Sequence, residues 1–376
     1  MITHPFVSGG IKEDIWEITV NTEATTSGAK TTGIPINLYS QPGITMKVDW
    51  GDGTESVLTS ASYSSASDSA PSVHEYATAG TYIVQMKSTK WKDAYIEVLG
   101  HTYTGVLSHI AGFRSTLVEV GQLPRCKGVL YRASSTSSPF RDIHRFRYCF
   151  YGCSNLTSIP AGLFDNNPAV MDFNSCFQGC SNLTSIPNGL FDNNPDVTSF
   201  NCCFWRCSKL QSIPSGLFHN NSKVTDFHMT FFACNLSDIP VDIFINCTAV
   251  TDMSGTFGNN PITSVPSGLF SSQTLVTTLG NNTNTSNGIF SAGSRGVIAI
   301  DENLFAHMLN LTQARFAFQG HYGFSIRFRA TELTDITAFC DKNTEHPVTV
   351  YVPAGSATAK AFHDIAGATG ITVVEE

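Results

Sequence analysis

The chain has little charge and no long apolar run. Only 14% of its 376 residues are Asp, Glu, Lys or Arg, the formal net charge is −8, and basic residues do not cluster. A weakly acidic chain does not complement the charge of nucleic acid or of an anionic membrane surface, so neither partner is expected. No segment reaches the roughly 18 apolar residues of a transmembrane helix, so no membrane span is expected.

Other patterns are also missing. The first twenty residues, MITHPFVSGGIKEDIWEITV, lack the basic and apolar regions of a secretory signal. No coiled-coil heptads set a copy number, although a homo-oligomer is compatible with the sequence. No G-x-S-x-G, H-E-x-x-H or Walker-type loop occurs. We therefore expect a non-enzymatic protein with no catalytic residues, no metal and no cofactor. A glycan-degrading enzyme would instead need a carboxylate pair in a cleft.

What the chain does contain is a repeat. CSNLTSIP at 153–160 returns at 180–187 and, as CSKLQSIP, at 207–214. A fixed period of 26–27 residues predicts a solenoid, because one repeat cannot bury its apolar face alone and stacked repeats can. The most regular columns predict a structural ladder of inward side chains: Phe150, Phe177, Phe204 and Phe231; Cys153, Cys180, Cys207 and Cys234; Ile159, Ile186, Ile213 and Ile239.

Two resemblances follow from these motifs. The pattern F-x-G-C-S-N-L-T-S-I-P-x-G-L-F, with AVTDMSGTF at 249–257, resembles the BspA-type leucine-rich repeats of bacterial surface and bacteriophage proteins. WGDG at 50–53 and HEYATAGTYIV at 74–84 are similar to PKD-like domains, which are immunoglobulin-like β-sandwiches.

The resemblances imply a mainly β chain in four parts. A PKD-like β-sandwich is expected at 1–99, a connecting or N-terminal capping segment at 100–140, a leucine-rich-repeat solenoid at 141–320, and a small α/β C-terminal cap at 321–376. Within the second part, 115–124 reads as a degenerate first repeat, with Leu117 and Val120 in inward positions. The cap reads as strand, short helix, strand.

Two sets of polar residues leave alternatives open. Asp49 and Asp52 read either as caps of the WGDG turn or as calcium ligands. The repeated cysteines can be interpreted as buried thiols, as disulfides between repeats or as a zinc site. Neighbouring repeats about 4.8 Å apart are within disulfide range, whereas a straight column does not converge tetrahedrally.

One column varies where its neighbours do not. Tyr151, Gln178, Trp205 and Phe232 follow the constant Phe, and Arg206 follows Trp205. An inward position would keep one size and polarity, so this column predicts an outward binding stripe. The alternative is that its rings pack on a neighbouring loop.

The resemblance and the apparent lack of a leader together predict a bacteriophage virion accessory, such as a capsid decoration, head-fibre or tail component. Its expected partners are other virion or surface proteins and a cell-surface glycan or receptor. The alternative is a bacterial cell-surface adhesin, located at the cell surface and not on the virion.

Overall fold

The computed structural model describes residues 15–22, 33–40, 45–59, 61–62, 72–88, 95–98, 117–120, 128–129, 146–280, 288–291, 296–341, 343 and 345–376. The chain is mainly β, as expected, and one α-helix lies within these residues. The elements are β1 (Ile15–Asn21), β2 (Gly33–Ser40), β3 (Thr45–Asp49), β4 (Glu55–Thr59), β5 (Ala61–Ser62), β6 (Ser72–Glu75), β7 (Thr81–Lys87), β8 (Tyr95–Val98), β9 (Leu117–Val120), β10 (Gly128–Val129), β11 (Gly296–Val297), β12 (His321–Tyr322), β13 (Ser325–Arg327), β14 (Val348–Val352), α2 (Ala357–Thr369) and β15 (Ile371–Glu375).

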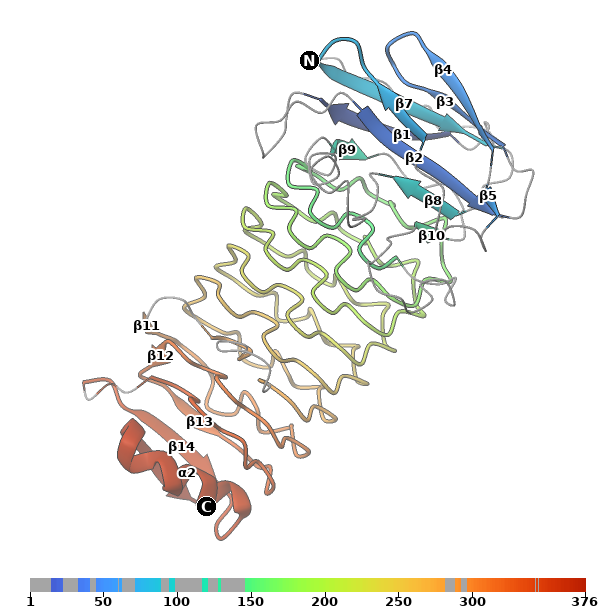
Figure 1. Ribbon diagram of the computed structural model, residues 1–376. Helices are drawn as coiled ribbons and strands as arrows, with labels where there is room; N and C mark the ends of the chain where they lie inside the picture. The colour runs from blue at the N-terminus through green and yellow to red at the C-terminus, as the bar shows by residue number, and fades with distance from the viewer. Residues whose placement is uncertain are drawn as a thin grey trace.

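Two five-stranded sheets form the N-terminal part. One has the order β4-β3-β7-β1-β9, and the other has the order β10-β8-β2-β5, with β6 also paired to β2. Trp16, Ile18 and Val20 of β1 are buried, and the residues between them are more exposed. This alternation buries one face of the first sheet. Figure 1 shows both sheets at one end of a long stack of turns.

Two short strands from the segment 100–140, expected as a connecting or capping segment with a degenerate repeat at 115–124, pair with the N-terminal sheets. Leu117–Val120 form β9, which pairs antiparallel with β1, and β10 pairs parallel with β8. Short strands thus extend both sheets beyond residue 99. The sequence LVEV is compatible with an edge strand and with a repeat. It forms an edge strand because the backbone of β1 offers it hydrogen bonds. The Ser-rich stretch 63–71 lies outside the described residues.

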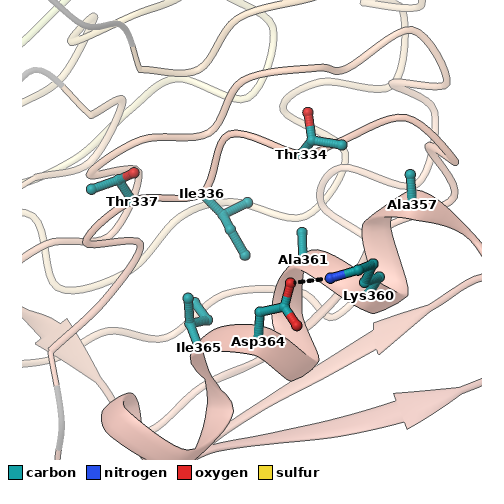
Figure 2. Close-up of a pocket in the computed structure, with 8 residues that line it drawn as sticks. All are labelled: Thr334, Ile336, Thr337, Ala357, Lys360, Ala361, Asp364 and Ile365. Carbon is teal, nitrogen blue, oxygen red and sulfur yellow. Dashed lines mark hydrogen bonds and ion pairs between the residues drawn. The ribbon is translucent and has the colours of Figure 1, made fainter.

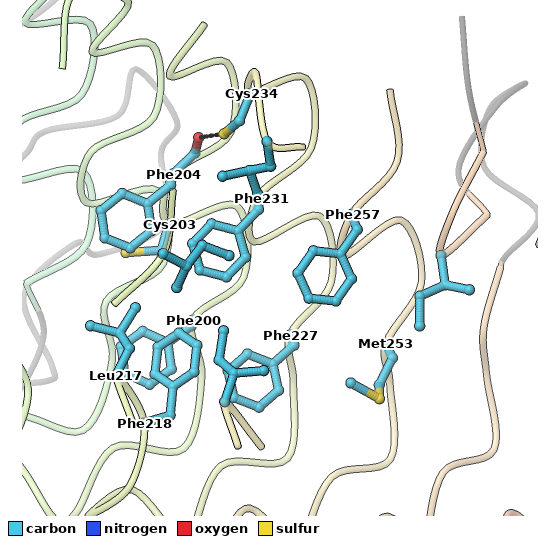
Figure 3. Close-up of a cluster of buried hydrophobic side chains, with 14 of the residues drawn as sticks. Phe200, Cys203, Phe204, Leu217, Phe218, Phe227, Phe231, Cys234, Met253 and Phe257 are labelled. Atoms are coloured by element: carbon cyan, nitrogen blue, oxygen red, sulfur yellow. Dashed lines mark hydrogen bonds between the residues drawn. The ribbon is translucent and has the colours of Figure 1, made fainter. Parts of the chain in front are cut away.

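The repeats stack as coils, meaning successive 26–27-residue turns of the chain. Each coil adds phenylalanine rings to continuous columns, with centroids 5.2 Å apart for Phe150–Phe177, 5.4 Å for Phe177–Phe204 and 5.5 Å for Phe204–Phe231. A second column runs through Phe191, Phe218 and Phe244. Figure 3 shows Phe204 and Phe231 of the first column and Phe218 of the second column in the core between coils. Every residue of the ladder expected from the sequence is at most 8% exposed, so the columns form the core.

Between residues 146 and 280 the coils contain no regular β-strand. They join through single parallel bridges such as Ser199↔Asp226 and Asp226↔Asp252. The cause is a recurring left-handed residue: Ser175, Cys202 and Met229 have φ between 50° and 55° in successive coils. One left-handed residue interrupts extended backbone and turns successive N–H groups to the same side.

The cysteine columns are thiols that form no disulfide. Ten cysteines lie in the described residues; Cys149 is half-buried and the other nine are buried, whereas Cys126 lies outside them. The thiols of Cys180, Cys207 and Cys234 donate to the carbonyls of Phe150, Phe177 and Phe204, each at 3.2 Å. Asn260 takes the same position in the next coil and donates to Phe231 O at 2.8 Å. Burial is the main cause that raises the pKa of these thiols, which keeps them protonated as donors.

A second column of donors contains asparagine. Asn194 Nδ2 donates to Asn167 O at 2.9 Å, and Asn221 Nδ2 donates to Asn194 O at the same distance. Cys247 and Gln273 occupy the same column further along, and both contact carbonyls of the preceding coil. These side chains satisfy buried carbonyls that a regular strand would pair through its backbone.

The stack continues past residue 320, the expected end of the array. Gln313 bridges Asp335 and Phe318 bridges Cys340, so one further coil follows. The strand, helix and strand expected in the cap are β14, α2 and β15, and β13-β14-β15 form a parallel sheet. Phe362 of α2 packs on Phe328 and Phe339. Among the described residues, no helix has the length and apolarity to cross a membrane.

Candidate functional site

We call Tyr151, Gln178, Trp205 and Phe232 the variable row. These residues occupy the same position in four successive coils, and backbone hydrogen bonds hold these positions in register: Gly152 N donates to Gln178 O and Gly179 N donates to Trp205 O, both at 2.7 Å. All four side chains are half-buried, whereas Arg206 is exposed. The row therefore lies at the surface of the stack and belongs only partly to its core.

The rings of the row contact their neighbours. The Trp205 and Phe232 centroids lie 6.5 Å apart, edge to face, and the Arg206 guanidinium carbon lies 5.2 Å from the Trp205 ring centroid. Tyr151 packs edge to face on Tyr148 at 5.8 Å. The rings of this column thus pack on one another and on Tyr148, and they still reach the surface.

The row ends after Phe232, where the next coil has Gly258. A side chain at position 258 would have its Cβ 2.7 Å from Phe232 Cε2. Phe232 therefore leans over the next coil, and that coil leaves the space for it. This contact fixes the ring at the end of the row.

Arg206 has a backbone conformation that arginine rarely adopts. Its φ is 62°. The matching residues are Gly152 (72°) and Gly179 (75°) in the two preceding coils, and Ala233 (56°) and Asn259 (56°) in the two following coils. Glycine enters this region freely, whereas a residue with a side chain pays about 1–2 kcal/mol. Strain of this kind concentrates at functional sites. The arginine stands where the fold would be satisfied by glycine, and its guanidinium covers the Trp205 indole.

The indole N–H of Trp205 lacks an acceptor. It is buried, and no residue in the described part of the chain accepts its hydrogen. Buried indole N–H groups usually find a partner. The row thus contains one buried N–H donor without an acceptor in the described part of the chain.

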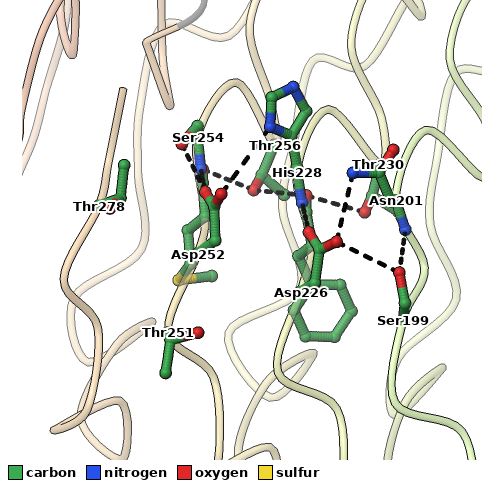
Figure 4. A network of polar contacts seen from close by, with 12 residues as sticks. Ser199, Asn201, Asp226, His228, Thr230, Thr251, Asp252, Ser254, Thr256 and Thr278 are labelled. Atoms are coloured by element: carbon green, nitrogen blue, oxygen red, sulfur yellow. Dashed lines mark hydrogen bonds and ion pairs between the residues drawn. The ribbon is translucent and has the colours of Figure 1, made fainter. Parts of the chain in front are cut away.

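The sequence reasoning missed a polar network that occupies the same stretch of each coil, a few residues before the row. Asp226 accepts from Asn201 Nδ2 at 3.2 Å and from the backbone N–H of His228 at 2.8 Å. Asp252 in the next coil accepts from Ser254 N at 2.8 Å, and its Oδ2 lies 3.9 Å from His228 Nδ1. Figure 4 shows the network running across three coils. In the sequence this network corresponds to an Asp that recurs two residues before a polar residue, as in Asp226 with His228 and Asp252 with Ser254.

The two carboxyl groups differ in protonation tendency. Burial, together with the neighbouring Asp252 charge, raises the pKa of Asp226. Burial also acts on Asp252, but hydrogen bonds from His228 and Ser254 outweigh it and hold the pKa of Asp252 below its usual value. Both carboxyl groups cap backbone N–H groups in their own coils, which is a structural role.

The other expected ligand residues also cap turns. Asp49 Oδ1 accepts from Gly51 N at 2.9 Å, and Asp52 Oδ1 accepts from Thr54 N at 3.0 Å. Asp52 Oδ2 lies 2.8 Å from His74 Nε2, and the His74 ring stacks on Trp50 with centroids 4.5 Å apart. Within the described residues, no three His, Cys, Asp or Glu side chains group as metal ligands.

Comparison with known proteins gives no relative. Neither the protein-family models nor the curated proteins that were searched match this chain.

Proposed function

We propose that this chain is a non-enzymatic interaction protein. The two N-terminal sheets would form the PKD-like, immunoglobulin-like sandwich, and the coils would form a BspA-type leucine-rich-repeat solenoid. The variable row, with Arg206, would be its binding surface for a cell-surface glycan or receptor. The observation that carries this proposal is the exposed Arg206 guanidinium over the Trp205 ring, at a left-handed position that glycine fills in the two preceding coils.

The chemistry of the row supports this ligand class. Half-buried rings offer flat apolar faces, which suit sugar rings and the apolar parts of a receptor. The exposed Arg206 adds hydrogen-bond donors beside these faces. Tyr and Trp contribute contact area at low entropic cost, and Arg binds carboxylates in pairs of hydrogen bonds.

Replacement of Arg206 by glycine tests the row without weakening the fold. For Arg206→Gly, we expect a free energy of unfolding that is unchanged or higher by up to about 1 kcal/mol, because the left-handed strain disappears. We expect binding to fall at least tenfold. The measurement is binding of the purified chain to an array of bacterial surface polysaccharides, with denaturant unfolding in parallel.

Lys223→Ala is the matched control, since Lys223 is an exposed cation of the same coil region that pairs with Asp196 on the surface. It should bind as the parent chain does. Equal binding by the parent, Arg206→Gly and Trp205→Ala chains would remove the variable row as the binding surface.

The proposed location is a bacteriophage particle, and its support is the resemblance of the repeats. Mass spectrometry of purified particles and of bacterial envelope fractions from the native source tests it. We expect the chain at a fixed ratio to the capsid protein in particles. Recovery from the envelope alone would make the protein a cell-surface adhesin.

A further inference from the structure

At Phe173, Ser175, Phe177 and Gly179, and at the matching residues of later coils, backbone N–H groups donate to the following coil. Just before these positions the direction is reversed, as in Thr225 N to Thr198 O at 2.9 Å. In the coil at 313–318, the N–H groups of Ala314, Phe316 and Phe318 donate to Asp335 O, Thr337 O and Phe339 O, at 2.8, 3.0 and 2.7 Å. The same pattern joins the earlier coils, as in Phe227 N to Asp252 O at 3.0 Å. Each coil therefore needs a following coil to accept its hydrogens.

The last coil has no such successor. Its matching donors are the N–H groups of Ile336, Ala338 and Cys340, and within the described residues none of the three has an acceptor. Ala338 has the left-handed φ of 50° that marks this position in the other coils, so its N–H keeps the same orientation. Backbone donors left unpaired are rare in folded proteins, because each costs about 1–3 kcal/mol when buried.

A pocket lies beside the first of these donors, because Ile336 lines it. It has a volume of about 370 Å³, and its apolar lining comes from Ile336 on the coil and from Ala357, Ala361 and Ile365 on α2, one helical turn apart. Thr334 and Thr337 complete the coil side. Figure 2 shows α2 facing this edge of the coil. The volume falls within the range of small binding sites. The helix cannot satisfy the edge, because its own backbone carbonyls are used within the helix.

The occupant of this edge must supply acceptors. A second copy that approached with the same edge would place donors opposite donors, which excludes edge-to-edge pairing of two identical coils. A free anion is disfavoured by carboxylates: Asp364 lines the pocket, Asp341 follows Cys340, and the Lys360 ammonium is already paired with Asp364 at 2.5 Å. Neutral backbone carbonyls meet both conditions.

We propose that this edge binds an extended peptide segment of a partner protein, which continues the stack as one more strand-like layer. Its carbonyls at alternate residues accept from Ile336, Ala338 and Cys340, and one small apolar side chain enters the pocket against α2. This is binding by addition to a free backbone edge. The site is independent of the variable row.

Amide hydrogen exchange of the full chain, resolved by residue, tests this edge. The probe is a synthetic peptide of residues 249–258, AVTDMSGTFG, whose carbonyls at Asp252, Ser254 and Thr256 accept from the preceding coil in the folded chain. Without the peptide, we expect the N–H groups of the last coil to exchange at least tenfold faster than those of Ala314, Phe316 and Phe318. At millimolar peptide, we expect them to slow at least tenfold.

Ala361→Trp fills the pocket and should abolish the effect of the peptide. Ala354→Trp, an exposed position outside the pocket, should leave it intact. Four results would overturn the proposal: slow exchange of the edge in the free chain, fast exchange that the peptide does not change, protection by inorganic phosphate in place of the peptide, and protection that rises with protein concentration alone. The last would show self-association.

Discussion

Phe218→Ala should lower the free energy of unfolding by about 3–5 kcal/mol, the usual cost of emptying a fully buried phenylalanine site. Phe218 is 0% exposed and lies in the middle of its column, stacked between Phe191 and Phe244 with centroids 6.1 and 6.3 Å away. It also contacts Phe200 at 4.5 Å and Phe227 at 4.8 Å. Because these four rings lose contacts at once, collapse around the cavity cannot recover much of the loss.

Denaturant unfolding followed by circular dichroism measures this effect. Val241→Ala is the control, because Val241 is a 52% exposed apolar residue of the same stack, and its loss should change stability by less than about 0.5 kcal/mol. A loss under about 1 kcal/mol for Phe218→Ala would contradict the ring columns as the core. A transition that splits into two would show that the two halves of the stack unfold separately.

Asn221→Leu should lower the free energy of unfolding by about 1–3 kcal/mol, although leucine is more apolar. The Asn221 amide donates to Phe191 O at 3.3 Å and to Asn194 O at 2.9 Å, and all of these groups are buried. Its own Oδ1 is buried and lacks a donor within the described residues. Leucine removes one unsatisfied acceptor, but it also takes one of two donors from each carbonyl. Phe191 O keeps only Asn194 N at 3.1 Å, and Asn194 O keeps only Val197 N at 3.4 Å. The two lost hydrogen bonds cost more than the added apolar contact returns.

Asn221→Gln distinguishes the donor role from side-chain volume. Gln273 fills the same column two coils later and donates to Phe244 O at 2.7 Å, so glutamine should cost less than about 1 kcal/mol. Asn220→Leu, at the exposed neighbouring position, should be close to neutral. Thermal and denaturant unfolding of the three variants gives the comparison. A leucine variant as stable as the parent would mean that these carbonyls do not need the amide.

The period of the stack was predictable from the sequence because inward positions have one requirement. A phenylalanine column such as Phe177 and Phe204 must keep the same shape to stack at a fixed rise, so the spacing itself reports the geometry. The left-handed residues were not predictable. They fall on Ser175, Cys202 and Met229, and these residue types do not indicate positive φ. The sequence therefore did not show that single bridges, and no longer strands, would join these coils.

The variable row was predictable as a column, but its backbone strain and the residues at which it ends were not. The variation from Gln178 to Trp205 marks a surface position in any stack. The conformation of Arg206 and the fit of Phe232 over Gly258 depend on backbone geometry that the sequence does not encode locally. The membership of β9 in the first sheet has a similar cause, because a short alternating segment is placed by the edge that accepts it.

The hydrogen bonds that each coil donates to the following coil also give the face of the variable row an electric polarity. In ordinary sheets neighbouring peptide dipoles alternate and largely cancel. On this face the N–H groups of Phe173, Ser175 and Phe177 all point to the next coil, and the same holds for each coil that follows. The dipoles of these peptide groups therefore add along the stack, with the positive end at the last coil, and the N–H groups of Thr198, Thr225 and Thr251, which point to the preceding coil, offset part of this sum. Duplication of a coil would lengthen this dipole and move its positive end further from the N-terminal sheets without changing the groups exposed there.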